Sequence, residues 1–270
     1  MLIEMTAADG TPLVMRRWLA TEARAALFYL HGIQSHSGWL WETGPFLAER
    51  GIEVYALDRR GSGASGGPRG HLPSAGTVLD DYAAALDLVH ELTDGMPVTA
   101  VGQSLGGSVL AALCATRETG LSGAIFCAPA LGQQRHRHGP AGLARMRLLS
   151  GTETTPVNLK DEQYTELPRY LSFMAHDPLM LRAVTHQSRA TFVALEDSYR
   201  SAVLSLPAAL LLPSEDSIIH IGRTCEVMRG LAPHAAVRTF AANSHYVEFS
   251  EVRTEYWHCV QEMAIRGIEP

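Results

Sequence analysis

The sequence predicts an α/β fold, a mostly parallel eight-stranded sheet with helices on both faces and an inserted helical cap. Two observations predict it. Short apolar runs alternate with helical patterns towards both ends of the chain, and this alternation stops at about residue 130 and resumes at about residue 207. We therefore expect residues 1–129 and 207–270 to form the core, and residues 130–206 to form the cap.

The N-terminal part of the predicted core begins with a hairpin and continues with alternating strands and helices. Residues 2–5 and 14–19 flank Asp9-Gly10, which is typical of a turn. Further strands are predicted at residues 25–30, 53–57, 97–101 and 123–127. The helices between them are expected at residues 41–50, at 78–92 after a cap at Thr77, and at 108–115.

The C-terminal part of the predicted core has the same alternation. Strands are expected at residues 208–212 and 236–240, and helices at 225–231 and 246–264. Residues 130–206 are rich in Arg, His and Gly, with helical patches but no strands predicted between them. Such an order favours a parallel sheet covered by helices, with one insertion after the sixth strand.

Composition excludes several classes of protein. The 270 residues are 46% apolar and 19% charged, which is typical of a folded domain. The net charge of −6 argues against nucleic acid as a partner. Four scattered cysteines, the absence of a secretory signal pattern and the lack of an apolar run of about 20 residues predict a cytoplasmic protein without stable membrane insertion.

The most specific motif is the G-x-S-x-G at residues 102–106, which lies between a predicted strand and a predicted helix. A serine in this context is typical of the nucleophile elbow of an α/β-hydrolase. The turn is so tight that a side chain at Gly102 or Gly106 would collide with neighbouring backbone, and it presents the Ser104 hydroxyl away from the sheet. Ser104 is therefore the predicted nucleophile.

A serine nucleophile needs a base and an acid that orients the base, and in this fold they follow in the order acid, then histidine. Asp216 follows the strand expected at 208–212, and His245 follows the strand at 236–240. Glu215 is the alternative acid, and Asp216 is favoured by its distance from the strand. For the oxyanion, the backbone N–H groups of Leu105 and Ile33 are the expected donors.

The chain resembles a known family in three segments: residues 31–38 (HGIQSHSG), 58–66 (DRRGSGASG) and 102–107 (GQSLGG). Together they are similar to the monoacylglycerol lipase and lysophospholipase group of α/β-hydrolases, which includes serine aminopeptidase-type enzymes. Residues 214–216 (SED) and 243–245 (NSH) match the acid and histidine segments of that group. The resemblance implies a serine hydrolase that cleaves esters through an acyl-enzyme, with a mobile cap and no cofactor.

Several residues are candidates for substrate contact, either near the predicted oxyanion loop, beside the nucleophile or in the cap. They are Gln34, Trp39, Trp41, Gln103, Tyr170 and Phe173. At the start of the cap, residues 133–139 (QQRHRHG) are basic. We expect a solvated surface loop there; docking of an acidic partner, such as an acyl carrier protein, is the alternative. A metal site at His136 and His138 is disfavoured, because no carboxylate or cysteine is close in sequence.

Two functions fit these observations. In the first, Ser104 attacks a small-molecule carboxylic ester or thioester with an apolar or aromatic acyl group, and water releases the acid. In the second, the same residues form the same acyl-enzyme, but a hydroxyl or thiol acceptor replaces water. The donor would then be a carrier-protein thioester in secondary metabolism, for example in peptide antibiotic biosynthesis. A silent ligand receptor is disfavoured by the apparently complete set of catalytic residues.

Overall fold

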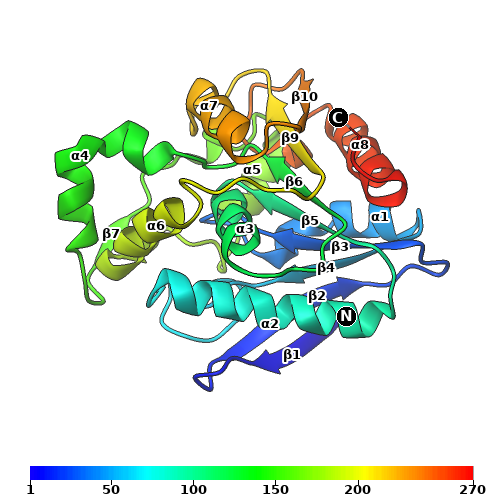
Figure 1. The fold of residues 1–270 in the computed structure, drawn as a ribbon, viewed down its shortest axis with the longest axis horizontal. Coiled ribbons are helices and arrows are strands. Elements are labelled where there is room, and N and C mark those ends of the chain that lie inside the picture. Colours follow the sequence, from blue (N-terminus) through cyan, green and yellow to red (C-terminus); the bar gives the residue numbers. More distant parts are fainter. Residues whose placement is uncertain (270) are drawn as a thin grey trace.

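The computed structural model describes residues 1–269 and contains a central sheet with helices on two faces (Figure 1). The strands of this sheet are β1 (Leu2–Thr6), β2 (Pro12–Trp18), β3 (Ala25–Leu30), β4 (Ile52–Leu57), β5 (Val98–Gln103), β6 (Gly123–Cys127), β9 (Ala208–Pro213) and β10 (Ala236–Phe240). The α-helices are α1 (Thr43–Ala48), α2 (Ala75–Thr93), α3 (Leu105–Thr116), α4 (Gln133–Arg147), α5 (Pro168–Ala175), α6 (His186–Ser198), α7 (Ile221–Leu231) and α8 (Arg253–Arg266).

The sheet has eight strands in the order β1-β2-β4-β3-β5-β6-β9-β10. The pairs β1/β2 and β2/β4 are antiparallel, and every pair from β4 to β10 is parallel. The predicted mostly parallel eight-stranded sheet is therefore confirmed. Because parallel strands run in the same direction, the carboxyl ends of β3, β5, β9 and β10 all lie at one edge of the sheet.

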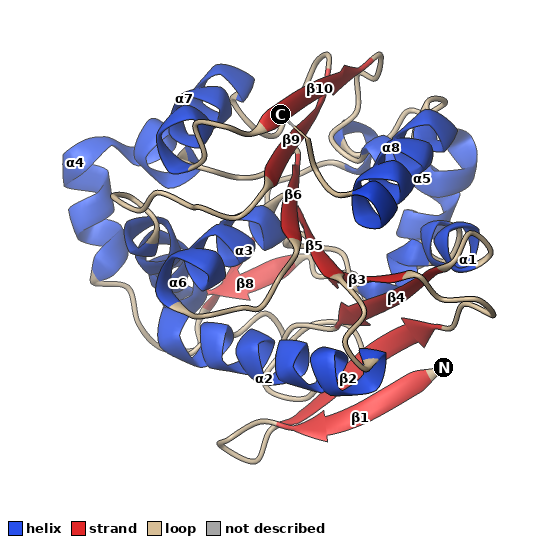
Figure 2. Ribbon diagram, turned by 45° about the vertical axis from the view of Figure 1, so that its right-hand side comes forward, coloured by secondary structure: helices blue, strands red, loops and turns tan. Residues whose placement is uncertain are grey.

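Helices cover both faces of the sheet, as Figure 2 shows, with α1 and α8 on one face and α2, α3 and α7 on the other. Strands β3 to β6 and β9 are almost completely buried, because each of their faces packs against a helix layer. Two apolar clusters result, one on each face; the larger contains Phe28 and Val109, and the smaller contains Leu27 and Trp257. None of the helices among residues 1–269 is both long and apolar enough to cross a membrane.

Some predicted element boundaries were wrong. The last helix begins at Arg253 rather than at residue 246, because Tyr246 and Phe249 are buried in an aromatic cluster and a 3₁₀ turn, η3 (Val247–Phe249), precedes it. Helix α2 is capped by the Ser74 hydroxyl, which accepts from the N–H of Thr77, so Thr77 is not the cap. Helix α3 begins directly after Ser104, and α1 is shorter than predicted.

Residues 130–206 differ from the prediction in two ways. They contain a small antiparallel pair, β7 (Thr154–Pro156) with β8 (Ala183–Thr185), whose three-residue strands are too short to show an alternating pattern. The basic residues 133–138 form the first part of helix α4, which is kinked at Gly139, so they are not a loop, although His136, Arg137 and His138 are exposed to solvent. The carboxylate of Glu196 in α6 accepts from the N–H groups of Gln134 and Arg135, 62 and 61 residues away in sequence, and thereby caps α4.

Candidate active site

Ser104 occupies the turn between β5 and α3, with backbone angles φ 52° and ψ −117°. Few non-glycine residues adopt a positive φ, so the turn is strained. A Cβ at Gly106 would lie 1.9 Å from the carbonyl oxygen of Leu30, and one at Gly102 would lie 2.7 Å from the carbonyl oxygen of Gly106. The predicted steric reason for both glycines is confirmed, because either side chain would overlap backbone.

Asp216 follows β9 and His245 follows β10, and the two side chains meet at the edge of the sheet where Ser104 lies. His245 Nδ1 is 2.7 Å from Asp216 Oδ2, and both side chains are fully buried. The other ring nitrogen, Nε2, has no hydrogen-bond partner among residues 1–269. Glu215 is exposed to solvent and forms no ion pair within the same described range, so the structure brings Asp216, and not Glu215, to the histidine.

The surroundings of Asp216 favour its ionised form. Burial acts to raise the pKa of this carboxyl, but His245 and the N–H groups of Ile218 and Ile219 outweigh burial and lower the pKa below its usual value. The two N–H groups donate to Oδ1 at 2.7 and 3.0 Å. Because a carboxylate can only accept, Nδ1 of His245 carries the ring proton and Nε2 is left as a free acceptor.

Two backbone donors lie beside the nucleophile. Leu105 is the first residue of α3, and Ile33 follows β3 in the loop at residues 31–36. Neither N–H group donates to another residue in the described part of the chain. Both residues line the same cavity of about 450 Å³ as Ser104. These donors are therefore available to a group bound next to the Ser104 hydroxyl.

A family profile described as Hydrolase_4, serine aminopeptidase S33, matches residues 21–250. The chain belongs to this family. The match spans the elbow, both loops that carry Asp216 and His245, and the whole insertion. The expected membership of the α/β-hydrolases, in the group similar to monoacylglycerol lipases, is thereby confirmed.

Individual relatives agree with the family assignment. The chain is 28% identical over 80% of its length to the uncharacterized protein YnbC of Escherichia coli, and 28% identical over 45% of its length to a monoacylglycerol lipase of Mycolicibacterium smegmatis. These alignments cover 38% and 44% of the two relatives, so the chain spans less than half of each. A soluble variant of the Saccharomyces cerevisiae monoglyceride lipase has the same fold, with a TM-score of 0.85 at 15% identity over 100% of this chain and 96% of that one.

The six residues expected to contact substrate do not line the Ser104 cavity. Trp39 is buried in an aromatic cluster with Tyr164, Tyr246 and Phe249, and Phe173 packs at its edge. Trp41 is 45% exposed beside Tyr170, whose hydroxyl binds Glu42. Gln103 is buried with both amide atoms unpartnered within residues 1–269, and Gln34 donates to the carbonyl oxygen of Leu181 and accepts from the Tyr164 hydroxyl. The positions of these six residues in the sequence, and the size of the aromatic ones, predicted that they line a substrate pocket. In the structure their side chains lie outside the Ser104 cavity.

Arg59 is a positioning residue that sequence reasoning missed. It is 3% exposed, and its guanidinium donates to the carbonyl oxygens of His31, Gly32 and Ile33 at 3.2 Å. The N–H of Arg59 also donates to His31 Nε2, so both ring nitrogens of His31 are occupied. The Arg59 side chain therefore fixes the loop that carries the Ile33 N–H group. The segment 58–66 was noticed only for its resemblance, which does not reveal this contact.

The two histidines of the disfavoured metal site lie apart. His136 packs against His220 with ring centroids 4.3 Å apart, whereas His138 lines the Ser104 cavity. No group of three His, Cys, Asp or Glu side chains suited to a metal ion occurs within residues 1–269.

Proposed function

We propose that the protein is a serine esterase in which Ser104 is the nucleophile, His245 the general base and Asp216 the residue that orients it. The observation that carries this proposal is the buried contact of His245 Nδ1 with Asp216, which leaves Nε2 as an acceptor with no partner in the described residues. A serine on a strained strand-to-helix turn in the same fold supplies the hydroxyl that such a base would activate.

The proposed reaction has two halves. The Ser104 hydroxyl oxygen adds to the ester carbonyl while its proton moves to His245 Nε2, and the carbonyl oxygen becomes an oxyanion bound by the N–H groups of Ile33 and Leu105. Each such donor contributes roughly 3–4 kcal/mol of barrier reduction. The intermediate collapses to an acyl-enzyme, and the leaving alkoxide takes the proton from His245. Water then repeats these steps, releases the acid and restores Ser104.

The walls of the cavity support an apolar acyl group. Besides Ile33 and Leu105, its apolar lining residues come from residues 130–206 and from the loop after β9, and they include Met146, Val157, Leu159, Val184, Phe192 and Ile218. Such a surface removes an alkyl or aryl chain from water at roughly 25 cal/mol per Å². Since most of these residues lie between positions 130 and 206, we infer that this segment is the cap over the site and that residues 1–129 and 207–270 are the core.

The test is a time course with 4-nitrophenyl esters of short, long and aromatic acids, using wild type, Ser104→Ala and the control Ser201→Ala. Ser201 is an exposed serine outside the Ser104 cavity. We expect multiple turnover in wild type and Ser201→Ala, and loss of at least about a thousandfold in Ser104→Ala. Multiple turnover that survives Ser104→Ala would contradict the assignment of the nucleophile.

Intact-mass spectrometry of the same reactions distinguishes the second candidate function. A single burst that leaves a stable acyl group on Ser104 would show that water is a poor acceptor. That result would favour acyl transfer to a hydroxyl or thiol, with a carrier-protein thioester as donor. Neither turnover nor an adduct would contradict both functions.

A further inference from the structure

The cavity that contains Ser104 has an unbalanced charge. Among its lining residues are the cations Arg137 and Arg189 and the imidazole of His138, and no Asp or Glu is part of the lining. The remaining polar residues of the wall, Gln134, Asn158 and Gln163, are neutral. A cleft lined by charges of one sign concentrates ligands of the opposite sign.

The two arginines of this cavity have only neutral partners. Arg137 donates to the carbonyl oxygen of Ile218, and Arg189 donates to the Thr155 hydroxyl and to the carbonyl oxygen of Pro156 at 3.0 Å. Neither guanidinium lies within 4.0 Å of a carboxylate in residues 1–269. Each therefore has N–H groups and a full positive charge left for a ligand.

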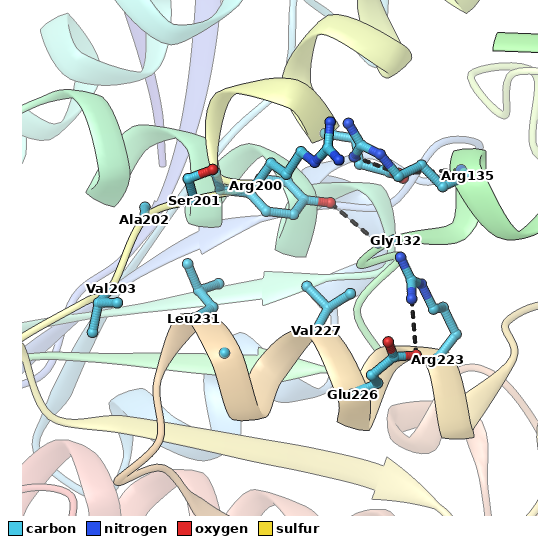
Figure 3. Close-up of a pocket in the computed structure, with 13 residues that line it drawn as sticks. Gly132, Arg135, Arg200, Ser201, Ala202, Val203, Arg223, Glu226, Val227 and Leu231 are labelled. Carbon is cyan, nitrogen blue, oxygen red and sulfur yellow. Dashed lines mark hydrogen bonds and ion pairs between the residues drawn. The ribbon is translucent and has the colours of Figure 1, made fainter. Parts of the chain in front are cut away.

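Several arginines near this cavity do pair with carboxylates, although Arg145 and Arg200 of the cap form no ion pair within residues 1–269. In α4 itself, Arg135 pairs with Glu196 and Asp197, and Arg147 pairs with Asp197. A second cavity of about 350 Å³ lies between α4, the segment after α6, and α7 (Figure 3). There Arg223 is paired with Glu226 at 2.8 Å, as the dashed line in Figure 3 shows. Carboxylates thus pair with several arginines that serve the fold, whereas no Asp or Glu lines the Ser104 cavity; the charges of Asp216 and Glu196 still act on Arg137 from outside the lining.

Arg137, His138 and Arg189 line one cavity. Partial burial, followed by the charges of Arg137, Arg189 and Arg145, lowers the pKa of His138. Arg137 and Arg189 come from different helices, α4 and α6, and both act on this one imidazole. The capping of α4 by Glu196 of α6 fixes the two helices against each other. The Arg137 guanidinium is held by the carbonyl oxygen of Ile218, and that of Arg189 by Thr155 and Pro156, so both are positioned before any ligand binds.

We propose that Arg137 and Arg189 bind an anionic group, a carboxylate or a phosphate, carried by the ester whose carbonyl Ser104 attacks. This inference rests on the proposed function for its reaction, but the binding site does not depend on turnover. The anion can be attached to the acyl group or to the alcohol, and the two arms of the experiment distinguish these sources. An apolar wall beside two cations favours an amphiphilic substrate with both an apolar chain and a charged end.

Binding is measured first, by calorimetry on the Ser104→Ala protein, because it needs no catalysis. One arm compares glutarate with pentanoate, and the other compares glycerol 3-phosphate with glycerol. In at least one arm we expect the ligand with the additional charge to bind at least about tenfold tighter, and this advantage to shrink with added salt. Equal affinities in both arms would overturn the proposal, whatever the activity of the enzyme.

Turnover is then compared for 4-nitrophenyl hydrogen glutarate against 4-nitrophenyl pentanoate, and for 1-octanoylglycerol 3-phosphate against 1-octanoylglycerol. Arg137→Gln and Arg189→Gln should each lower kcat/KM for the anionic ester of the favoured arm about tenfold and leave its neutral analogue within about twofold. The control is Arg200→Gln, which removes an exposed cap arginine outside this cavity and should change neither. Equal losses on neutral and anionic esters would overturn the proposal, whereas lack of turnover of every ester would count against the proposed function alone.

Discussion

Asp216 and Glu215 are adjacent carboxylates that the fold places in different surroundings. The Asp216 side chain is fully buried against His245, while Glu215 is exposed. Sequence spacing favoured Asp216 but could not exclude Glu215, because both follow the same strand. The contact that distinguishes the two carboxylates is that of Asp216 with His245. These residues are 29 positions apart in sequence, so no local sequence pattern predicts the contact.

This difference gives a matched pair of variants. Asp216→Asn should lower kcat at least about a thousandfold, because an amide can stabilise the wrong tautomer of His245 and cannot stabilise the imidazolium that forms during catalysis. Glu215→Gln, which makes the same chemical change on an exposed neighbour, should stay within about twofold. Turnover of a 4-nitrophenyl ester by both variants checks this. Similar losses in the two variants would contradict the assignment of the acid.

Glu248 is a second buried carboxylate, outside the proposed catalytic set. Tyr29 donates to Oε2 at 2.8 Å, whereas Oε1 has no partner among residues 1–269. Burial raises the pKa of Glu248 from 4.5 to about 7, although the Tyr29 and Tyr246 hydroxyls oppose the shift. At pH values between about 4.5 and about 7, the Glu248 carboxyl is therefore protonated in the folded state and ionised in the unfolded state.

The sign of the resulting pH dependence follows from linkage. Stability falls as pH rises from about 4.5 to about 7, by about 3 kcal/mol from this group, and the loss is complete above about pH 7. Glu248→Gln keeps an acceptor for Tyr29 and should remove this part of the dependence. Urea unfolding of both proteins across the pH range measures it, with Glu251→Gln as the exposed control. The prediction would be contradicted if the unfolding free energies of wild type and Glu248→Gln changed equally with pH.

At the scale of elements, the sequence predicted the sheet well because its strands are short apolar runs bounded by turn residues. The number of strands in the sheet, their mostly parallel arrangement and the strand that precedes each predicted catalytic residue followed from this pattern, whereas the order of the strands within the sheet did not. The insertion was predicted poorly, because its geometry depends on contacts between segments far apart in the chain. Helix α4 is the clearest case, since its N-terminal N–H groups are capped by Glu196.

The six residues expected to contact substrate lie outside the Ser104 cavity for a related reason. Large aromatic side chains near a predicted site are candidates for a pocket, but burial in an aromatic cluster requires the same residues. Trp39, with its ring stacked 5.4 Å from that of Phe249, belongs to the cluster. Arg137 and His138, which were expected on a solvated loop, are exposed but lie on a helix and line the mouth of the cavity. Which face of a helix meets a cavity is decided by tertiary packing, and helical periodicity is weak in such a polar segment.

At the scale of the whole molecule, the insertion is attached to both loops of the proposed catalytic site. The N–H of Leu181 donates to the carbonyl oxygen of Gln34 at 3.0 Å, next to Ile33 in the chain. On the other side, the N–H of His245 donates to the carbonyl oxygen of Gln163 at 3.0 Å. Residues 161–181 therefore connect the two loops.

Asp177 offers a test of that connection. One of its carboxylate oxygens, Oδ2, accepts from Trp39 Nε1 at 2.8 Å and lies 3.0 Å from His36 Nε2, and its side chain is 5% exposed. Burial acts to raise the pKa of Asp177, but the hydrogen bonds from His36 and Trp39 outweigh it and lower the pKa. A lowered folded pKa means that this contribution to stability is present above about pH 4 and is lost as pH falls through the folded value.

Asp177→Ala leaves two buried donors without an acceptor, so at pH 7 we expect a loss of about 2–4 kcal/mol of unfolding free energy. Because the same contact holds the segment that binds Gln34, we also expect faster hydrogen exchange at the Leu181 N–H and a fall of about tenfold in kcat as the Ile33 donor loses its position. The control is Asp161→Ala, which breaks a pair with the half-exposed Arg182 in the same segment and should cost less than about 1 kcal/mol. If Asp177→Ala loses stability while exchange at Leu181 and kcat stay unchanged, the cap segment does not position the oxyanion loop, and the coupling of cap to site would have to lie in the contacts at His245.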